Sequence, residues 1–352
     1  MSGPTVQHHG RARYSRFQRM IASLRYFFVR YYYLSPLREA LDHAKNRLLG
    51  ASAVRLEASS ICQLACPVCP TGTGAIRGRP VGWGYLSFGN FAAFVDSNPS
   101  IKKIELSNWG EIFLNPDLKK IIEYACQKNI ALSAGNGVNL NTLSEDMAET
   151  LVRCRFRRLT VSIDGASSGT YAQYRKNGNF GRVLENIKKI NKYKQMHRSR
   201  YPKLTWKFIV FGHNEHEIPA ARKMAKGLGM RFFPQLNWSP TYSPIKDEEF
   251  VERETGFGVS TSRAYLRKTN PGTPFLSYCH QLWTSPQINW DGKLLGCCVN
   301  RTVSFGNVFE KGLDACTKDE RYELMKKTVK GKAPVREDLP CFTCSHFPFA
   351  KN

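Results

Sequence analysis

The chain lacks any uninterrupted apolar stretch near the roughly 20 residues that a membrane-spanning helix needs. Its basic beginning has no clean apolar segment followed by a small-residue cleavage site, so a secretory signal peptide is not expected. Acidic residues are scarce, with 28 Asp and Glu against 52 Lys and Arg, and the formal net charge is +24. These features predict a cytoplasmic protein whose excess of cations favours anionic partners.

Histidine spacing typical of a metal site is also missing, and eleven cysteines in 352 residues are too few for a disulfide scaffold. Three of these cysteines, however, lie close together in a C-x3-C-x2-C loop formed by Cys62, Cys66 and Cys69. A [4Fe–4S] cluster normally takes four thiolates, so three on one loop leave one iron for an outside ligand. The alternatives are a zinc site, which prefers four closed ligands in paired units, and a disulfide-bonded loop. Neither alternative fits this spacing well.

The first fifty residues are rich in arginine and aromatic residues. Within residues 11–30, apolar residues recur at helical spacing: Phe17, Met20, Ile21, Leu24, Phe27 and Phe28. Residues 1–50 are therefore interpreted as a basic amphipathic helical leader. Its apolar stripe could pack on the rest of the protein, or it could place residues 11–30 on an anionic membrane surface, peripherally at the inner face of the membrane. Clustered cations also attract nucleic acid, but no RNA-binding module supports that partner.

Short apolar strands then alternate with helical stretches, which is the pattern of parallel β/α units. Six strands are predicted, at 54–57, 103–106, 130–133, 159–163, 204–210 and 231–235. Helices are predicted between them at 88–96, 116–128, 143–154, 180–195 and 217–228. The fold class is therefore α/β, with six β/α units.

Polar or glycine-containing motifs follow these strands. The cysteine loop comes after the first, and further motifs come after the next four: Trp109-Gly110-Glu111, Asn136-Gly137, Asp164-Gly165 and Asn214. In barrels of parallel strands the active site is built at the carboxyl ends of the strands. A single Glu111 or Asp164 would more often be a solvated acid or a helix cap, but we expect the five loops to converge on one face.

Four further cysteines lie near the C-terminus: Cys279, Cys297, Cys341 and Cys344. Residues 288–295 are interpreted as a hairpin with Asp291-Gly292 at its turn. Four thiolates can hold zinc or complete a [4Fe–4S] site. Cys298 adjoins Cys297, and Cys297 is chosen as the ligand because of its spacing from Gly292.

The cysteine loop resembles that of the radical SAM superfamily, in which S-adenosylmethionine (SAM) chelates the fourth iron of a [4Fe–4S] cluster. The resemblance implies a partial (β/α)6 TIM-like barrel, here residues 51–237. It also implies contacts with SAM. Val68 would lie beside the adenine, and Gly110 and Glu111 would hold the methionine ammonium. The ribose or carboxylate would be held by Ser162, Asp164 and Arg175. Trp109 departs from the Gly-Gly-Glu segment of the family, which leaves the detail of that contact open.

The C-terminal quartet resembles the SPASM/twitch extension of the same superfamily. The chain ends eight residues after Cys344, so the resemblance implies the short form with one auxiliary [4Fe–4S] cluster, as in dehydrogenases of the 2-deoxy-scyllo-inosamine type. Residues 279–352 would form this small β-hairpin/helix domain. Residues 238–278, rich in Pro, Ser, Thr and charge, would bridge it to the barrel and cover the site.

These resemblances imply a radical SAM oxidoreductase that forms a 5′-deoxyadenosyl radical and abstracts a substrate hydrogen. The expected substrate is a small hydroxylated molecule or saccharide that is oxidised by two electrons. The positive charge of the protein suggests that this substrate is anionic. Flavodoxin or ferredoxin would supply electrons. The alternatives are a radical SAM maturase of a peptide or protein side chain and a non-catalytic zinc- or nucleic-acid-binding protein. The sequence assigns no catalytic acid or base.

Overall fold

The computed structural model describes residues 52–239, 241–269, 277–344 and 347. The chain divides after Leu48 into two compact units, and all described residues belong to the second, Leu49–Asn352. The predicted leader, 1–50, and its proposed membrane-contacting part, 11–30, lie outside the described residues. Among the described helices, none combines the length and apolar character needed to cross a membrane.

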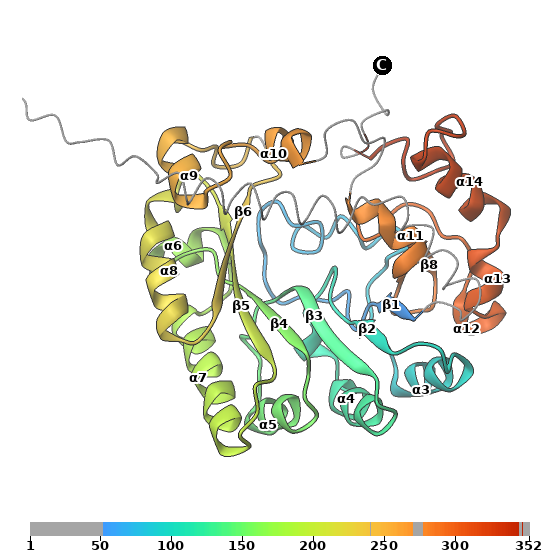
Figure 1. Cartoon of the computed structure of the whole chain (residues 1–352), viewed down its shortest axis with the longest axis horizontal. Coiled ribbons are helices and arrows are strands. Elements are labelled where there is room, and N and C mark those ends of the chain that lie inside the picture. Colours follow the sequence, from blue (N-terminus) through green and yellow to red (C-terminus); the bar gives the residue numbers. More distant parts are fainter. Residues whose placement is uncertain (1–51, 240, 270–276, 345–346, 348–352) are drawn as a thin grey trace, which may run out of the picture. The chain divides into compact units, whose positions relative to one another are not determined.

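A single sheet of eight strands in the order β6-β5-β4-β3-β2-β1-β7-β8 forms the centre of the described structure (Figure 1). The six predicted strands are all present and parallel: β1 (Ala53–Leu56), β2 (Lys103–Glu105), β3 (Ala131–Val138), β4 (Arg158–Ser162), β5 (Lys203–Val210) and β6 (Arg231–Leu236). The expected α/β fold with a partial (β/α)6 barrel is confirmed.

Five helices connect these strands close to their predicted positions: α3 (Phe88–Ser97), α4 (Leu118–Gln127), α5 (Glu145–Arg153), α7 (Phe180–Met196) and α8 (Ile218–Gly227). Three of them begin at a polar cap whose side chain accepts a backbone N–H: Ser87 for α3, Ser144 for α5 and Asn179 for α7. Such caps satisfy amide donors that the first helical turn leaves unpaired.

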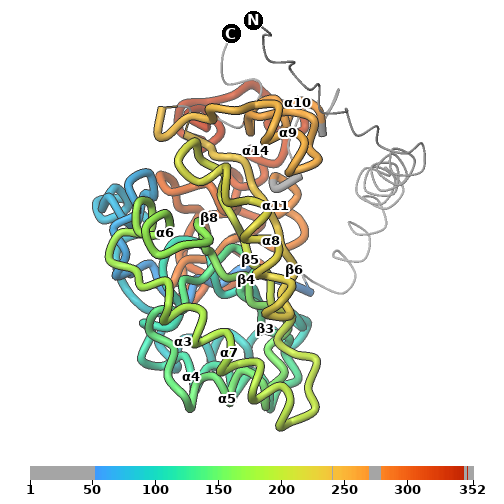
Figure 2. The backbone as a smooth tube through the Cα atoms, turned by 90° about the vertical axis from the view of Figure 1, so that its left-hand side faces the viewer, coloured from blue at the N-terminus to red at the C-terminus, as the bar shows by residue number. Residues whose placement is uncertain are grey.

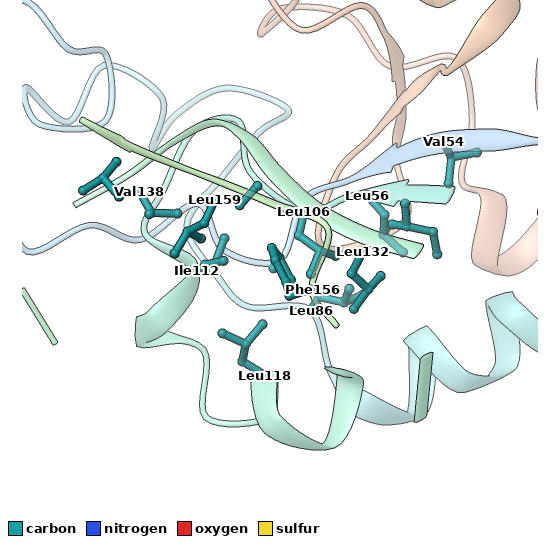
Figure 3. Close-up of a cluster of buried hydrophobic side chains, with 14 of the residues drawn as sticks. Val54, Leu56, Leu86, Leu106, Ile112, Leu118, Leu132, Val138, Phe156 and Leu159 are labelled. Carbon is teal, nitrogen blue, oxygen red and sulfur yellow. The ribbon is translucent and has the colours of Figure 1, made fainter. Parts of the chain in front are cut away.

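Apolar residues that alternate along the strands pack against these helices. On β5, Leu204, Trp206 and Phe208 belong to the main hydrophobic core, while the intervening Lys207 is only half-buried on the opposite face. Figure 3 shows strand side chains such as Leu132 and Leu159 gathered near Leu118 at the start of α4. The polar residues at the alternating strand positions therefore face the interior of the barrel.

Strand β3 is longer than predicted. The sequence placed Asn136-Gly137 after the strand, whereas the structure places both residues inside it. The pairing with β4 shifts register between Ala134 and Val138, because the chain takes extra residues at this point. Bulges of this kind commonly lie beside active sites, where they redirect backbone and side-chain groups.

Three elements of the barrel region were not predicted: α6 (Ser168–Tyr174), α9 (Glu248–Thr255) and α10 (Ser262–Thr269). The described part of the segment interpreted as a linker, 238–278, therefore contains the two helices α9 and α10. Asp247 caps α9, and Gly256 ends it in the left-handed conformation. Figures 1 and 2 both place α9 and α10 at the end of the sheet opposite to α4 and α5. Two single turns, η1 (Ile112–Leu114) and η2 (Glu215–Glu217), follow β2 and β5.

The predicted C-terminal hairpin is present as β7 (Gln287–Ile288) and β8 (Leu294–Gly296), which pair antiparallel. Strand β7 also pairs in parallel with β1, so the hairpin continues the sheet of the barrel. Short helical segments surround it: η3 (Ser277–His280), α11 (Gln281–Thr284), α12 (Val308–Lys311), α13 (Leu313–Thr317) and α14 (Glu320–Val329).

Candidate iron–sulfur and SAM site

The cysteine loop follows β1 and is folded tightly on itself. Cys66 is buried, while Cys62 and Cys69 are partly exposed. The amide of Cys69 donates to the Cys66 carbonyl at 3.2 Å. A Cβ on Gly72 would lie 2.7 Å from the backbone nitrogen of Cys66, which real Cβ atoms do not tolerate. Glycine is thus required where the chain returns across the loop. Val68, between the second and third cysteines, is 36% exposed and open to a ligand.

Two of the three sulfur atoms receive hydrogen bonds from neighbouring loops. Asn139 Nδ2 donates to Cys62 Sγ, and Arg175 Nη1 donates to Cys66 Sγ, each at 3.7 Å. Burial, reinforced by Glu111, raises the pKa of Cys62 to about 12, and burial also raises the pKa of Cys66. A bound cation reverses this preference and stabilises thiolates.

The donor set fits an iron–sulfur cluster. Three sulfur ligands lie on one loop, and N–H donors are directed at two of them, as second-shell groups are at such clusters. No three His, Cys, Asp or Glu side chains in the described part of the chain are arranged as ligands of a single metal ion. Cys62, Cys66 and Cys69 are therefore the residues that would hold the SAM-binding cluster.

The loop after β2 is attached to the cysteine loop. Glu57, buried just beyond β1, accepts the amides of Asn108, Trp109 and Gly110 at 3.0–3.4 Å. A Cβ on Gly110 would lie 2.3 Å from the Ser59 carbonyl oxygen. Gly110, the glycine that the predicted segment retains, therefore permits the close approach of the two loops.

Glu111 has a local structural role. Its carboxylate caps η1 by accepting the Phe113 amide at 3.2 Å, and it also accepts the amide of Asn139. Burial raises the pKa of Glu111 to about 7. The neighbouring Trp109, which departs from the family segment, packs with Trp83 against the cluster Ile76, Val81 and Leu295.

Asp164 and Arg175 are paired with each other. Arg175 Nε donates to Asp164 Oδ2 at 2.6 Å, and Asp164 Oδ1 accepts the Ile209 amide at 2.6 Å. Ser162 is buried nearby at the end of β4. All three predicted residues thus lie on the cysteine-loop side of the barrel. The remaining predicted motif residue, Asn214, is fully buried and bonds the Asp164 carbonyl, which gives it a structural role.

Sequence reasoning missed two residues of this site. Asn139 links Cys62, Gln63 and the carboxylate of Glu111. Lys207 lies in the middle of β5 and donates to the Asn136 carbonyl. Burial, with the nearby Arg175, lowers the pKa of Lys207 to about 8. The sequence signal was a lysine between Trp206 and Phe208 in the middle of a strand.

The structure also gathers the C-terminal cysteines. Burial raises the pKa of Cys297 well above its usual range, and the thiols of Cys298, Cys279 and Cys341 add to this effect. Burial, with neighbouring Cys279 and Cys344, raises the pKa of Cys341 to about 12. Cys279 thus lies near both Cys297 and Cys341, and Cys344 lies near Cys341. Four sulfur donors at 279, 297, 341 and 344 fit a complete cluster site.

Cys298 is held differently from Cys297. Its amide donates to Gln281 Oε1 at 3.0 Å, and Gln281 Nε2 donates to its sulfur at 3.5 Å. Its carbonyl accepts from Asn108 Nδ2 at 2.9 Å. These bonds favour Cys297 as the ligand, and they connect the hairpin to the loop after β2.

A partial parallel barrel with three cysteines after its first strand, joined to a second cysteine-rich domain, defines an iron–sulfur enzyme. The model of the radical SAM superfamily matches residues 56–225, and that of the SPASM iron-sulfur cluster-binding domain matches residues 279–345. Together they cover more than half of the chain. The protein belongs to the radical SAM superfamily and carries a SPASM domain, and these domains imply [4Fe–4S] clusters and SAM as cofactors.

Two solved structures of SuiB agree with this fold. SuiB of Streptococcus suis bound to S-adenosylmethionine is 15% identical, with a TM-score of 0.61, covering 95% of this chain and 82% of SuiB. SuiB bound to its precursor peptide SuiA gives a TM-score of 0.57 at 15% identity, covering 88% and 74% of the respective chains. BtrN in complex with AdoMet and 2-DOIA is 13% identical, with a TM-score of 0.47 and coverage of 86% and 93%. Among curated proteins, none matches the chain.

Proposed function

We propose that this radical SAM enzyme oxidises a small hydroxylated or saccharide substrate by two electrons. The observation that carries the proposal is the polar inner face of the barrel. Glu105 on β2 accepts the hydroxyls of Ser107 at 2.7 Å and Ser133 at 2.6 Å. Arg55 on β1 donates to Gln287 of the C-terminal hairpin at 3.0 Å. Closed TIM barrels fill this space with branched apolar side chains.

In the proposed reaction, the residues of this chain bind the cofactors and orient SAM and the substrate. Cys62, Cys66 and Cys69 would hold the SAM-binding cluster, and Cys279, Cys297, Cys341 and Cys344 the auxiliary cluster. When bound, these cofactors supply the 5′-deoxyadenosyl radical that removes a substrate hydrogen atom and an acceptor for the second electron.

SAM would be oriented by residues around the cysteine loop. Val68 offers an exposed apolar surface for the adenine. Gly110 and Glu111 would hold the methionine end, and Ser162, Asp164 and Arg175 the ribose and carboxylate. Because Arg175 already pairs with Asp164, its position is fixed before a ligand arrives. Tyr174, Phe211 and Tyr242 pack beside the cysteines and would exclude water.

Iron and sulfide analysis under anaerobic conditions tests the cofactor assignment. We expect about eight irons per wild-type chain and about four in a Cys62/Cys66/Cys69→Ala variant. This variant should form no 5′-deoxyadenosine from SAM and dithionite. The matched control is Cys126→Ala, because Cys126 is exposed. Zinc without iron in the wild type would refute the assignment.

The substrate class requires a separate measurement. Deuterated polyols, sugars and sugar acids should transfer deuterium to 5′-deoxyadenosine and yield a product lighter by two hydrogens. Transfer from peptides, with none from any saccharide, would favour the alternative of a peptide maturase. The likeness to SuiB shows the fold alone and does not select that alternative. The superfamily match argues against the third alternative, a non-catalytic zinc- or nucleic-acid-binding protein.

A further inference from the structure

A lysine without a carboxylate partner faces the barrel interior. On β5, Trp206 and Phe208 are fully buried in the core beneath the helices, and Lys207 between them lies on the opposite face. Within the described residues, its ammonium makes one hydrogen bond, to the carbonyl of Asn136, and no acidic side chain is within ion-pairing distance. An ammonium has three donors, so two remain available to a ligand.

The backbone beside Lys207 is shaped by the bulge in β3. Gly137 has φ +140°, and a Cβ there would lie 3.2 Å from Lys207 Nζ and 2.4 Å from Ser162 Oγ. Lys207 and Ser162 are also register partners on β5 and β4. An ammonium from the middle of β5 and a hydroxyl therefore border the same glycine near the carboxyl ends of β3 and β4.

Among the described residues, no carboxylate pairs directly with Lys207. Burial and the nearby Arg175 lower the pKa of Lys207, whereas Asp164 and Cys69 oppose this shift, and Asp164 is already bonded to Arg175. Burying a cation without an anion is costly. A ligand oxyanion would offset this cost, and it would gain hydrogen bonds from groups already in place.

We propose that Lys207, beside the Gly137 backbone, binds a carboxylate or phosphate of the substrate. The inference rests on the proposed function and narrows it to an acidic substrate, such as a sugar acid or sugar phosphate. The same chemistry could come from the carboxylate of SAM, and the experiment must separate the two sources.

Acetylation of lysines by an N-hydroxysuccinimide ester, measured by mass spectrometry, tests the site without knowledge of the substrate. The anaerobic holoprotein would be labelled with and without SAM, in succinate, in inorganic phosphate, and in chloride of equal ionic strength. Lys203, at the exposed beginning of the same strand, is the internal reference. With SAM bound, succinate or phosphate at about ten times its Kd should slow acetylation of Lys207 about tenfold and leave Lys203 unchanged.

Two results would overturn the site. One is equal acetylation of Lys207 in chloride, succinate and phosphate. The other is full protection by SAM alone, with no further effect of either anion, which would assign the lysine to the carboxylate of SAM.

Calorimetric titration of succinate into the SAM-loaded protein gives an independent check. Lys207→Met should abolish binding, and Lys207→Arg, which keeps the charge, should retain it within about tenfold. Unchanged binding by Lys207→Met would contradict the proposal.

The anion site and the proposed function can be refuted independently. A wild type that forms 5′-deoxyadenosine but shows no anion protection refutes only the anion site. A wild type that forms no 5′-deoxyadenosine refutes the proposed function, whether or not succinate binds.

Discussion

Arg175 and Asp164 form a buried ion pair that also contacts the cysteine loop. Arg175 Nε donates to Asp164 Oδ2 at 2.6 Å, and Nη1 of the same guanidinium donates to Cys66 Sγ at 3.7 Å. The Asp164 side chain is fully buried, and that of Arg175 is 13% exposed. The segment after β4 and the end of α6 are thereby attached to the loop that would hold the SAM-binding cluster.

Removal of Asp164 should therefore be costly. Asp164→Ala leaves the guanidinium buried without its counterion and the Ile209 amide without its acceptor, so we expect a loss of about 3–5 kcal/mol of unfolding free energy. The control is Asp314→Ala, since Asp314 pairs with Lys318 on the surface and exposed pairs contribute about 0–1 kcal/mol. Thermal unfolding of both variants measures the difference. Equal melting temperatures would contradict the structural importance of the pair.

Glu57 should make stability depend on pH. Burial raises the pKa of Glu57 from 4.5 to about 8. Between these values the folded protein retains a proton that the unfolded chain has lost, so stability falls as pH rises through this range. Glu57→Gln cannot titrate, and its melting temperature should fall less between pH 5 and 8. Parallel curves for the two proteins would show that Glu57 does not titrate in this way.

The contact between the two loops can be tested at Gly110. Gly110→Ala would place a methyl group 2.3 Å from the Ser59 carbonyl and 2.6 Å from that of Ile61. The cysteine loop must then move, and iron content should fall toward the half that the auxiliary site retains. Gly89→Ala is the control, because a Cβ there meets nothing within 4 Å. Full iron content in Gly110→Ala would show that the loops separate without cost to the site.

The assignment of Cys297 predicts opposite results for adjacent cysteines. Cys297→Ser should lose the auxiliary cluster and about four irons, because Cys297 lies beside Cys279 and Cys341. Cys298→Ser should retain it, since Gln281 already bonds both the amide and the sulfur of Cys298. Iron analysis with electron paramagnetic resonance of the reduced proteins distinguishes them. The reverse pattern would reassign the ligand to Cys298.

The parallel strands and the cysteine loop were predictable because both have local sequence signals. Alternating apolar residues identify β5, and the spacing of Cys62, Cys66 and Cys69 identifies the iron site. The bulge in β3 was not predictable, because it depends on pairing with β4, and Asn136 and Gly137 were consequently placed beyond the strand. Helices α9 and α10 were missed because their polar, charged sequence resembles that of a linker.

The site contacts were the least predictable feature. A sequence does not show that Arg175 is committed to Asp164, or that Glu111 caps η1 and accepts the Asn139 amide, since both facts depend on loops far apart in the chain. Lys207 was overlooked for the same reason. Its significance comes from its place on the inner face of the barrel and from the lack of an ion-pair partner among the described residues, which only the folded barrel reveals.

The pairing of β7 with β1 limits where the chain can be truncated without exposing the sheet. Strand β1 leads directly into the cysteine loop, and β2 and β7 flank it on either side. A chain truncated before the hairpin would present β1 as a bare edge, with unpaired backbone groups open to strands of other chains. The C-terminal domain is thus not a detachable module, and a shortened enzyme should aggregate before its chemistry can be measured.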